Sequence, residues 1–133
     1  MGYEPKWVID GILAKSSRPG YRSENVSIDT VDAWIEKVKN MEINSIICFL
    51  AERQLDFYSG IPYGLLEHYR KSGFEVLHLP EKDYLSPPLS EETLKKAVSG
   101  FEELEKPVLI HCSAGIDRTG LAIRNIEDRI SMS

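Results

Sequence analysis

The stretch Val108–Gly120 reads VLIHCSAGIDRTG and combines a strand, a loop and the start of a helix. The apolar run Val108–Ile110 predicts a buried strand, and Cys112 stands just beyond it. Gly115 permits a tight loop, and a helix is expected from 118 to about 130. In sheets of parallel strands, ligands bind beyond the carboxyl ends of the strands. The loop after Cys112 is therefore the candidate binding site.

The rest of the chain repeats this alternation of apolar runs and amphipathic segments. An Asp10-Gly11 turn predicts an N-terminal hairpin. The sequence then predicts, in chain order, a helix capped by Asp29 or Thr30, a strand over 45–50, a helix over 64–72 closed by Gly73, a strand over 74–79, and a helix that begins at Ser90 and is stopped by Pro107. Such alternation implies a three-layer α/β fold, with a central, mostly parallel sheet flanked by helices.

Length and charge narrow the class of protein. The chain has 133 residues, which suggests one domain over 1–133. Its formal net charge is −5, and this excludes a general basic patch for nucleic acid or an anionic membrane. No apolar run approaches the ~20 residues that span a bilayer, and the N-terminus lacks the pattern of a secretion signal. A cytoplasmic protein with reduced thiols is expected.

The loop after Cys112 is suited to hold an oxyanion. The candidate substrate-binding residues are those of the loop and the arginine that follows it: Ser113, Ala114, Gly115, Ile116, Asp117 and Arg118. Successive backbone N–H groups can form a concave nest, and the next helix adds its positive end. The planar fork of Arg118 suits two phosphate oxygens. These groups favour the thiolate of Cys112, a nucleophile aimed at phosphorus. The Thr119 hydroxyl could donate to that thiolate and make it a better leaving group.

The alternative for Cys112 is a small buried core residue, with Arg118 at the surface. Cys48 fits that description better, because it lies within an apolar run that has no arginine or glycine-rich loop beside it. Neither cysteine has a second Cys or a His at metal-ligand spacing. The sequence therefore predicts neither a zinc site nor a disulfide framework.

The spacing H-C-x5-R-[ST]-G resembles the signature of the protein tyrosine and dual-specificity phosphatases, and most of all their compact dual-specificity members. The resemblance covers most of the chain, from the hairpin to the helix after the loop. It implies a hydrolase that forms a cysteinyl-phosphate on Cys112, needs no metal or other cofactor, and takes a proton from an aspartate on a separate loop. It also implies that His111 supports the loop through hydrogen bonds.

Two aspartates compete for the role of the acid. Asp83 lies in HLPEKDYLSPP, between a strand and a Pro-Pro step, where the resemblance places that acid. Asp117 adjoins Arg118, as in bacterial phosphatases with broad or lipid substrates, although Ile116 stands where those have lysine. Asp83 is the expected acid. Asp117 is expected to pair with Arg118 or another basic side chain, or to accept backbone N–H groups.

These residues predict a phosphomonoesterase that acts on phosphotyrosine, and also on phosphoserine or phosphothreonine, in phosphorylated proteins or peptides. The neutral-to-acidic loop argues against phosphoinositides and RNA triphosphates, which would favour extra Lys or Arg within it. Three alternatives stay open: a phosphate-binding pseudoenzyme, a broad-substrate or lipid phosphatase that uses Asp117, and an enzyme of sulfur or arsenate chemistry with the same Cys-loop-Arg geometry.

The C-terminal end departs from the family pattern. Thirteen residues follow Gly120, whereas dual-specificity domains continue with one or two further helices. The domain is minimal, or the chain is a fragment, or a partner covers the exposed face. The apolar positions of the last helix would favour self-association if they were left bare; they are Leu121, Ile123, Ile126 and Ile130.

Overall fold

The computed structural model describes residues 3–132 of the chain. Five strands form one sheet: β1 (Lys6–Ile9), β2 (Leu13–Ser16), β3 (Ser45–Cys48), β4 (Glu75–His78) and β5 (Val108–His111). Their order across the sheet is β1-β2-β5-β3-β4. β1 is antiparallel to β2, and the other neighbouring pairs are parallel. The predicted N-terminal hairpin and mostly parallel sheet are confirmed.

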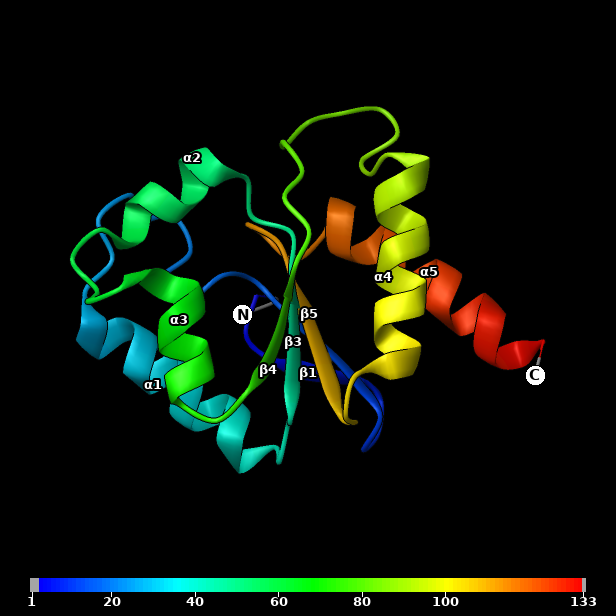
Figure 1. Cartoon of the computed structure of the whole chain (residues 1–133), viewed down its shortest axis with the longest axis horizontal. Coiled ribbons are helices and arrows are strands. Elements are labelled where there is room, and N and C mark those ends of the chain that lie inside the picture. The colour runs from blue at the N-terminus through cyan, green and yellow to red at the C-terminus, as the bar shows by residue number, and fades with distance from the viewer. Residues whose placement is uncertain (1–2, 133) are drawn as a thin grey trace.

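Helices cover both faces of this sheet. They are α1 (Ile28–Asn40), α2 (Glu52–Leu55), α3 (Gly64–Lys71), α4 (Glu91–Glu103) and α5 (Asp117–Ser131), with a short 3-10 helix over Asp56–Tyr58. α1 and α3 lie on one side of the strands, and α4 and α5 lie on the other (Figure 1). The three predicted layers are therefore present. Among residues 3–132, no helix has both the length and the apolar character needed to cross a bilayer.

The start of α1 differs from the prediction. Neither Asp29 nor Thr30 caps this helix. The cap is Ser27, which has extended backbone angles and whose side-chain oxygen accepts a hydrogen bond from the backbone N–H of Thr30 at 3.2 Å. The apolar periodicity begins only at Val31, so it did not mark the true first turn.

Each face of the sheet has its own apolar core. In β3 and the residue after it, Ile46 and Cys48 pack on the α1/α3 side, whereas Ile47 and Phe49 pack on the α4/α5 side. Every residue of β3 and β5 is buried, which explains why these strands read as continuous apolar runs. Burial also raises the pKa of the Cys48 thiol to about 12, as expected of a structural cysteine.

α5 does not leave its apolar face bare. Ile123 and Ile126 are buried in the same core as residues of α4, and Leu121 packs partly against that core. Ile130 is 41% exposed. The expected patch is thus mostly covered by α4 within the chain itself, and it no longer argues for self-association.

Candidate active site

Three neighbouring strands deliver the candidate residues to one edge of the sheet. Cys112 follows β5, Gln54 lies in α2 just beyond β3, and Asp83 lies in the loop after β4. β5, β3 and β4 are adjacent and parallel, so their carboxyl ends meet at one edge. The sequence therefore placed Cys112 and Asp83 correctly, and the parallel sheet brings them together.

The loop after Cys112 is tightly folded against the end of β2. Gly115 has φ +77°, and a Cβ at this position would overlap the carbonyl oxygen of Ser16 and lie 2.9 Å from the nitrogen of Ser17. The N–H of Arg18 donates to the carbonyl of Ser113 at 2.8 Å, which ties the loop to the segment after β2. Only glycine fits this close approach of two backbones.

Burial varies along the loop, and Gly115 is buried against the end of β2. Cys112 is 2% exposed and belongs to the core on the α4/α5 side. Ser113 and Ala114 are half-buried, and Ile116 is 56% exposed. The nucleophile candidate is thus buried, whereas Ser113, Ala114 and Ile116 of the loop are partly or largely exposed.

His111 lies on the opposite face of β5 from Cys112, as strand alternation predicts. Its Nδ1–H donates to the carbonyl of Cys112 at 3.0 Å, and its Nε2 accepts from the Tyr69 hydroxyl at 3.0 Å. Complete burial lowers the pKa of His111 to about 4, so the ring is neutral and this tautomer satisfies both bonds. Trp34 packs edge-on against the ring, with centroids 5.6 Å apart.

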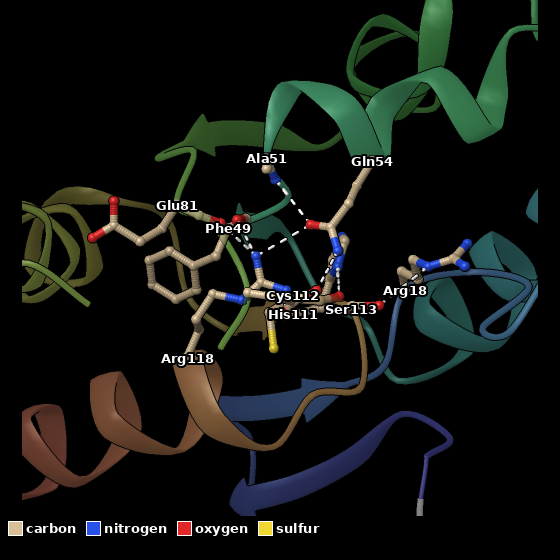
Figure 2. A network of polar contacts seen from close by, with 10 residues as sticks. Arg18, Phe49, Ala51, Gln54, Glu81, His111, Cys112, Ser113 and Arg118 are labelled. Atoms are coloured by element: carbon tan, nitrogen blue, oxygen red, sulfur yellow. Dashed lines mark hydrogen bonds and ion pairs between the residues drawn. The ribbon is translucent and has the colours of Figure 1, made fainter. Parts of the chain in front are cut away.

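Arg118 is buried and contacts the segments that follow β3 and β4. Its Nη1 donates to the carbonyls of Phe49 at 3.0 Å and Glu81 at 2.6 Å, and to Gln54 Oε1 at 3.2 Å. Its Nη2 forms an ion pair with Asp83 Oδ1. Figure 2 shows the guanidinium group reaching from the first turn of α5 to Gln54 and these two carbonyls. The alternative that placed Arg118 at the surface is therefore wrong.

The two aspartates are placed very differently. Asp83 pairs with Arg118, and it also accepts from Gln54 Nε2 at 2.5 Å. Asp117 is exposed at the start of α5 and forms no ion pair among the residues that the structure describes. The expected pairing of Asp117 with Arg118 is therefore wrong, because the arginine turns toward Asp83 instead.

Thr119 carries the one buried side-chain polar atom, within residues 3–132, that lacks a hydrogen-bond partner. Its hydroxyl oxygen was expected to donate to Cys112, and that bond is not formed in this structure. A buried hydroxyl without a partner is costly, so a group that accepts from it would be favoured here.

Two further polar residues at the site escaped sequence reasoning. Gln54 is 4% exposed and contacts both Arg118 and Asp83. Arg18 lies in the loop after β2, where its sequence permits either a place at the rim of the pocket or an ordinary loop position, and it is 3% exposed. Its guanidinium group donates to Tyr58 Oη at 3.2 Å and to the carbonyl of Ser23 at 2.7 Å, and its Nε lies 3.4 Å from Ser113 Oγ. No local pattern marks either residue, because both are defined by distant contacts.

A pocket of about 710 Å³ opens beside Asp83. Its walls are residues 51–54 after β3 and residues 80–85 after β4. Within the part of the chain that is described, no group of three or more His, Cys, Asp or Glu side chains could hold a metal ion.

Two solved structures are similar to this chain. The crystal structure of Tk-PTP in the active form is similar, with a TM-score of 0.53 and 26% identity over 86% of this chain. This chain spans 65% of the length of the Tk-PTP chain. The structure of P. aeruginosa TpbA in complex with pTyr matches at a TM-score of 0.49 and 17% identity, over 90% of this chain and 64% of that one. No curated protein matches.

The family comparison covers most of the chain. The family Tc-R-P, described as "Polymorphic toxin system, DSP-PTPase phosphatase", matches residues 20–127. The match includes the candidate acid, the whole loop after β5 and most of α5. The chain therefore belongs to the DSP-PTPase phosphatase family of polymorphic toxin systems.

Proposed function

We propose that this chain hydrolyses phosphate monoesters of tyrosine, and of serine or threonine, in proteins or peptides, with Cys112 as the nucleophile. The observation that carries the proposal is the convergence of Asp83 and Arg118 beside the loop of Cys112. An acid, an anion-binding arginine and a cysteine at the base of a nest are the groups that such a reaction needs. Membership of a phosphatase family supports the same conclusion.

In the first proposed step, the Cys112 thiolate attacks phosphorus and the bond from phosphorus to the ester oxygen breaks. Asp83, in its protonated form, gives its proton to the departing oxygen. The backbone N–H groups of the loop and Arg118 bind the other phosphate oxygens, whose charge grows in the transition state. His111 holds the carbonyl of Cys112 and thereby the start of the loop.

In the second step, water attacks phosphorus and the phosphorus–sulfur bond breaks. The Asp83 carboxylate takes the proton from that water, and the sulfur leaves as a thiolate. The buried Thr119 hydroxyl, which has no other partner in residues 3–132, is available to donate to the thiolate as it forms. The step releases inorganic phosphate and restores the starting protonation states.

Arg118 must release Asp83 before its Nη2 can turn fully to phosphate. Its Nη1 donates to two carbonyls and to Gln54, its Nη2 pairs with Asp83, and its Nε has no hydrogen-bond partner among residues 3–132. A phosphate in the loop would offer several charged oxygens to Nε and Nη2, in place of the one carboxylate oxygen of Asp83. The same exchange would free Asp83 to meet the leaving group.

The proposal also states that residues 1–133 form a single domain and that the reaction needs no cofactor.

The test is hydrolysis of p-nitrophenyl phosphate against pH, without added metal, by wild type and by Cys112→Ser, Asp83→Asn and Asp117→Asn. We expect no turnover by Cys112→Ser, and about a hundredfold loss for Asp83→Asn together with loss of the basic-side pH dependence. Asp117→Asn should resemble wild type.

Other outcomes would point elsewhere. Loss of the basic-side pH dependence in Asp117→Asn, but not in Asp83→Asn, would move the acid into the loop and favour the broad-substrate or lipid phosphatases. Vanadate binding by a wild-type protein without turnover would favour a pseudoenzyme. Full activity in Cys112→Ser would overturn the nucleophile assignment.

A further inference from the structure

A second cavity, of about 340 Å³, adjoins the loop of Cys112 on the side of the N-terminal hairpin. Residues 114–116 of the loop and Gly120 of α5 form one wall. Three basic side chains also line the cavity: Lys6 of β1, Lys15 of β2 and Arg124 of α5. We call this cluster of three cations the basic pocket. No part of it belongs to the catalytic machinery proposed above.

The two lysines face each other across the hairpin. Lys6 and Lys15 are paired in the antiparallel register of β1 and β2, so their side chains project from the same face of the sheet. Like charges at directly opposed positions destabilise a hairpin. A bound anion between them would turn this repulsion into attraction.

The charge of the basic pocket is not neutralised within the chain. Lys6, Lys15 and Arg124 form no ion pair among the described residues. The acidic side chain that lines the cavity is Glu4, and it is already paired with Lys37 at 2.7 Å. A local excess of positive charge therefore lies beside the phosphate-binding loop of a chain whose net charge is −5.

Arg124 links the basic pocket to the start of α5. Its Nη1 lies 3.5 Å from the point that a Cβ on Gly120 would occupy, so its guanidinium group covers the first turn of the helix. Gly120 follows directly after the proposed catalytic residues Arg118 and Thr119. Residues 114–116 line the same cavity, so an anion held by Arg124 would lie beside the phosphate-binding loop.

We propose that the basic pocket binds an acidic group of a phosphopeptide substrate, a carboxylate or a second phosphate near the residue that is hydrolysed. This inference rests on the proposed function and names its substrate class. The size of the cavity suits a single anionic group. The overall negative charge of the chain opposes an anionic membrane surface, which favours a peptide over a phosphoinositide in a bilayer.

The experiment measures kcat/KM on three substrates: p-nitrophenyl phosphate, a phosphotyrosine peptide with neutral neighbours, and a matched peptide with Asp, Glu or phosphoserine beside the phosphotyrosine. The variants are Lys6→Gln, Lys15→Gln, Arg124→Gln and the triple variant. Lys95→Gln and Lys96→Gln are the controls, since these lysines are exposed on α4, away from the loop, and pair with Glu91 and Glu92.

We expect wild type to prefer the acidic peptide, and this preference to fall about three- to tenfold in each variant and further in the triple variant. Rates on p-nitrophenyl phosphate and on the neutral peptide should stay unchanged, and added salt should reduce the preference of wild type alone. Equal rates on both peptides in wild type, or equal losses on all substrates in the variants, would overturn the proposal. So would tighter binding of the basic pocket to vesicles with phosphatidylinositol 4,5-bisphosphate than to the acidic peptide.

A binding measurement with labelled peptides distinguishes failure of this proposal from failure of the proposed function. Fluorescence polarisation of labelled peptides on Cys112→Ser, with and without the three substitutions, reports the basic pocket without any turnover. If wild type fails to hydrolyse p-nitrophenyl phosphate but the acidic peptide still binds through Lys6, Lys15 and Arg124, the proposed function fails and the basic pocket stands. If wild type hydrolyses p-nitrophenyl phosphate but the three substitutions leave peptide binding unchanged, the proposed function stands and the basic pocket is excluded as a binding site.

Discussion

At the scale of single residues, Gln54 connects the two charged groups of the site. Its Nε2 donates to Asp83 Oδ2 at 2.5 Å, while its Oε1 accepts from Arg118 at 3.2 Å and from the backbone N–H of Ala51 at 3.0 Å. The bond to Ala51 fixes which end of the amide faces which partner. Gln54 therefore orients the acid and the arginine without touching the reacting atoms, and we infer that it is a positioning residue.

We expect Gln54→Met, which keeps the size of the side chain but none of its hydrogen bonds, to misplace Asp83. The rate should fall about tenfold for phenyl phosphate, whose leaving group needs a proton, and much less for 2,4-dinitrophenyl phosphate, whose leaving group does not. Gln54→Glu keeps an acceptor for Arg118 but loses the donor to Asp83, so it should show the same selective loss. Measuring kcat across a series of aryl phosphates gives the slope of rate against leaving-group pKa.

The matched control for Gln54 is Asp56→Asn, an exposed position in the 3-10 helix that follows α2, outside the walls of the pocket. The slope of rate against leaving-group pKa for this variant should equal that of wild type. If Gln54→Met slowed every ester by the same factor, Gln54 would support only the fold, and its role in placing the acid would be excluded.

At the scale of elements, the strand, loop and helix around Cys112 could be predicted because their signals are local. An apolar run, a glycine and an amphipathic segment follow one another without a gap. The segment after β3 could not be predicted as α2 and a 3-10 helix, because its helices are four and three residues long and carry no full apolar period. Gln54 was missed with it, since its polar partners come from other elements.

We expect Gly115→Ala to distort the loop. Alanine would have to adopt the left-handed backbone conformation of Gly115. Its methyl group would also overlap the carbonyl of Ser16. Either the loop or the end of β2 must move, at a cost of about 1–3 kcal/mol in the free energy of unfolding and with a large loss of kcat/KM. Urea unfolding and p-nitrophenyl phosphate hydrolysis measure the two effects.

Two glycines provide controls for this substitution. Gly11 has a positive φ but open space around it, so Gly11→Ala reports the backbone strain alone. Gly60 has neither feature, so Gly60→Ala should be close to neutral. Retention of full activity by Gly115→Ala would mean that the loop tolerates the displacement and that its contact with β2 does not shape the site.

At the scale of the whole molecule, apolar runs alternate with segments of helical apolar spacing. This alternation predicted the order of strands and helices and the three layers. It could not show which helix would cover the apolar face of α5, because the sequence of one helix does not determine which other helix packs against it. The same limit applies to His111. Its place on the strand predicted the face it occupies, but its partners, Tyr69 and Trp34, come from α3 and α1 on the far side of the sheet from Cys112.

The buried His111 should make the stability of the whole fold depend on pH. Burial lowers its pKa to about 4 from an ordinary value of 6.5, so the unfolded chain binds a proton between these pH values and the folded chain does not. The free energy of unfolding is therefore highest above pH 6.5 and should fall by about 3 kcal/mol as the pH drops to 4. Urea unfolding of wild type and His111→Asn at half-unit steps between pH 4 and 8 tests this.

The asparagine keeps a donor for the carbonyl of Cys112 but cannot titrate, so the difference between the two curves isolates the histidine. That difference should shrink toward low pH, and two parallel curves would show that His111 is not held neutral by the fold.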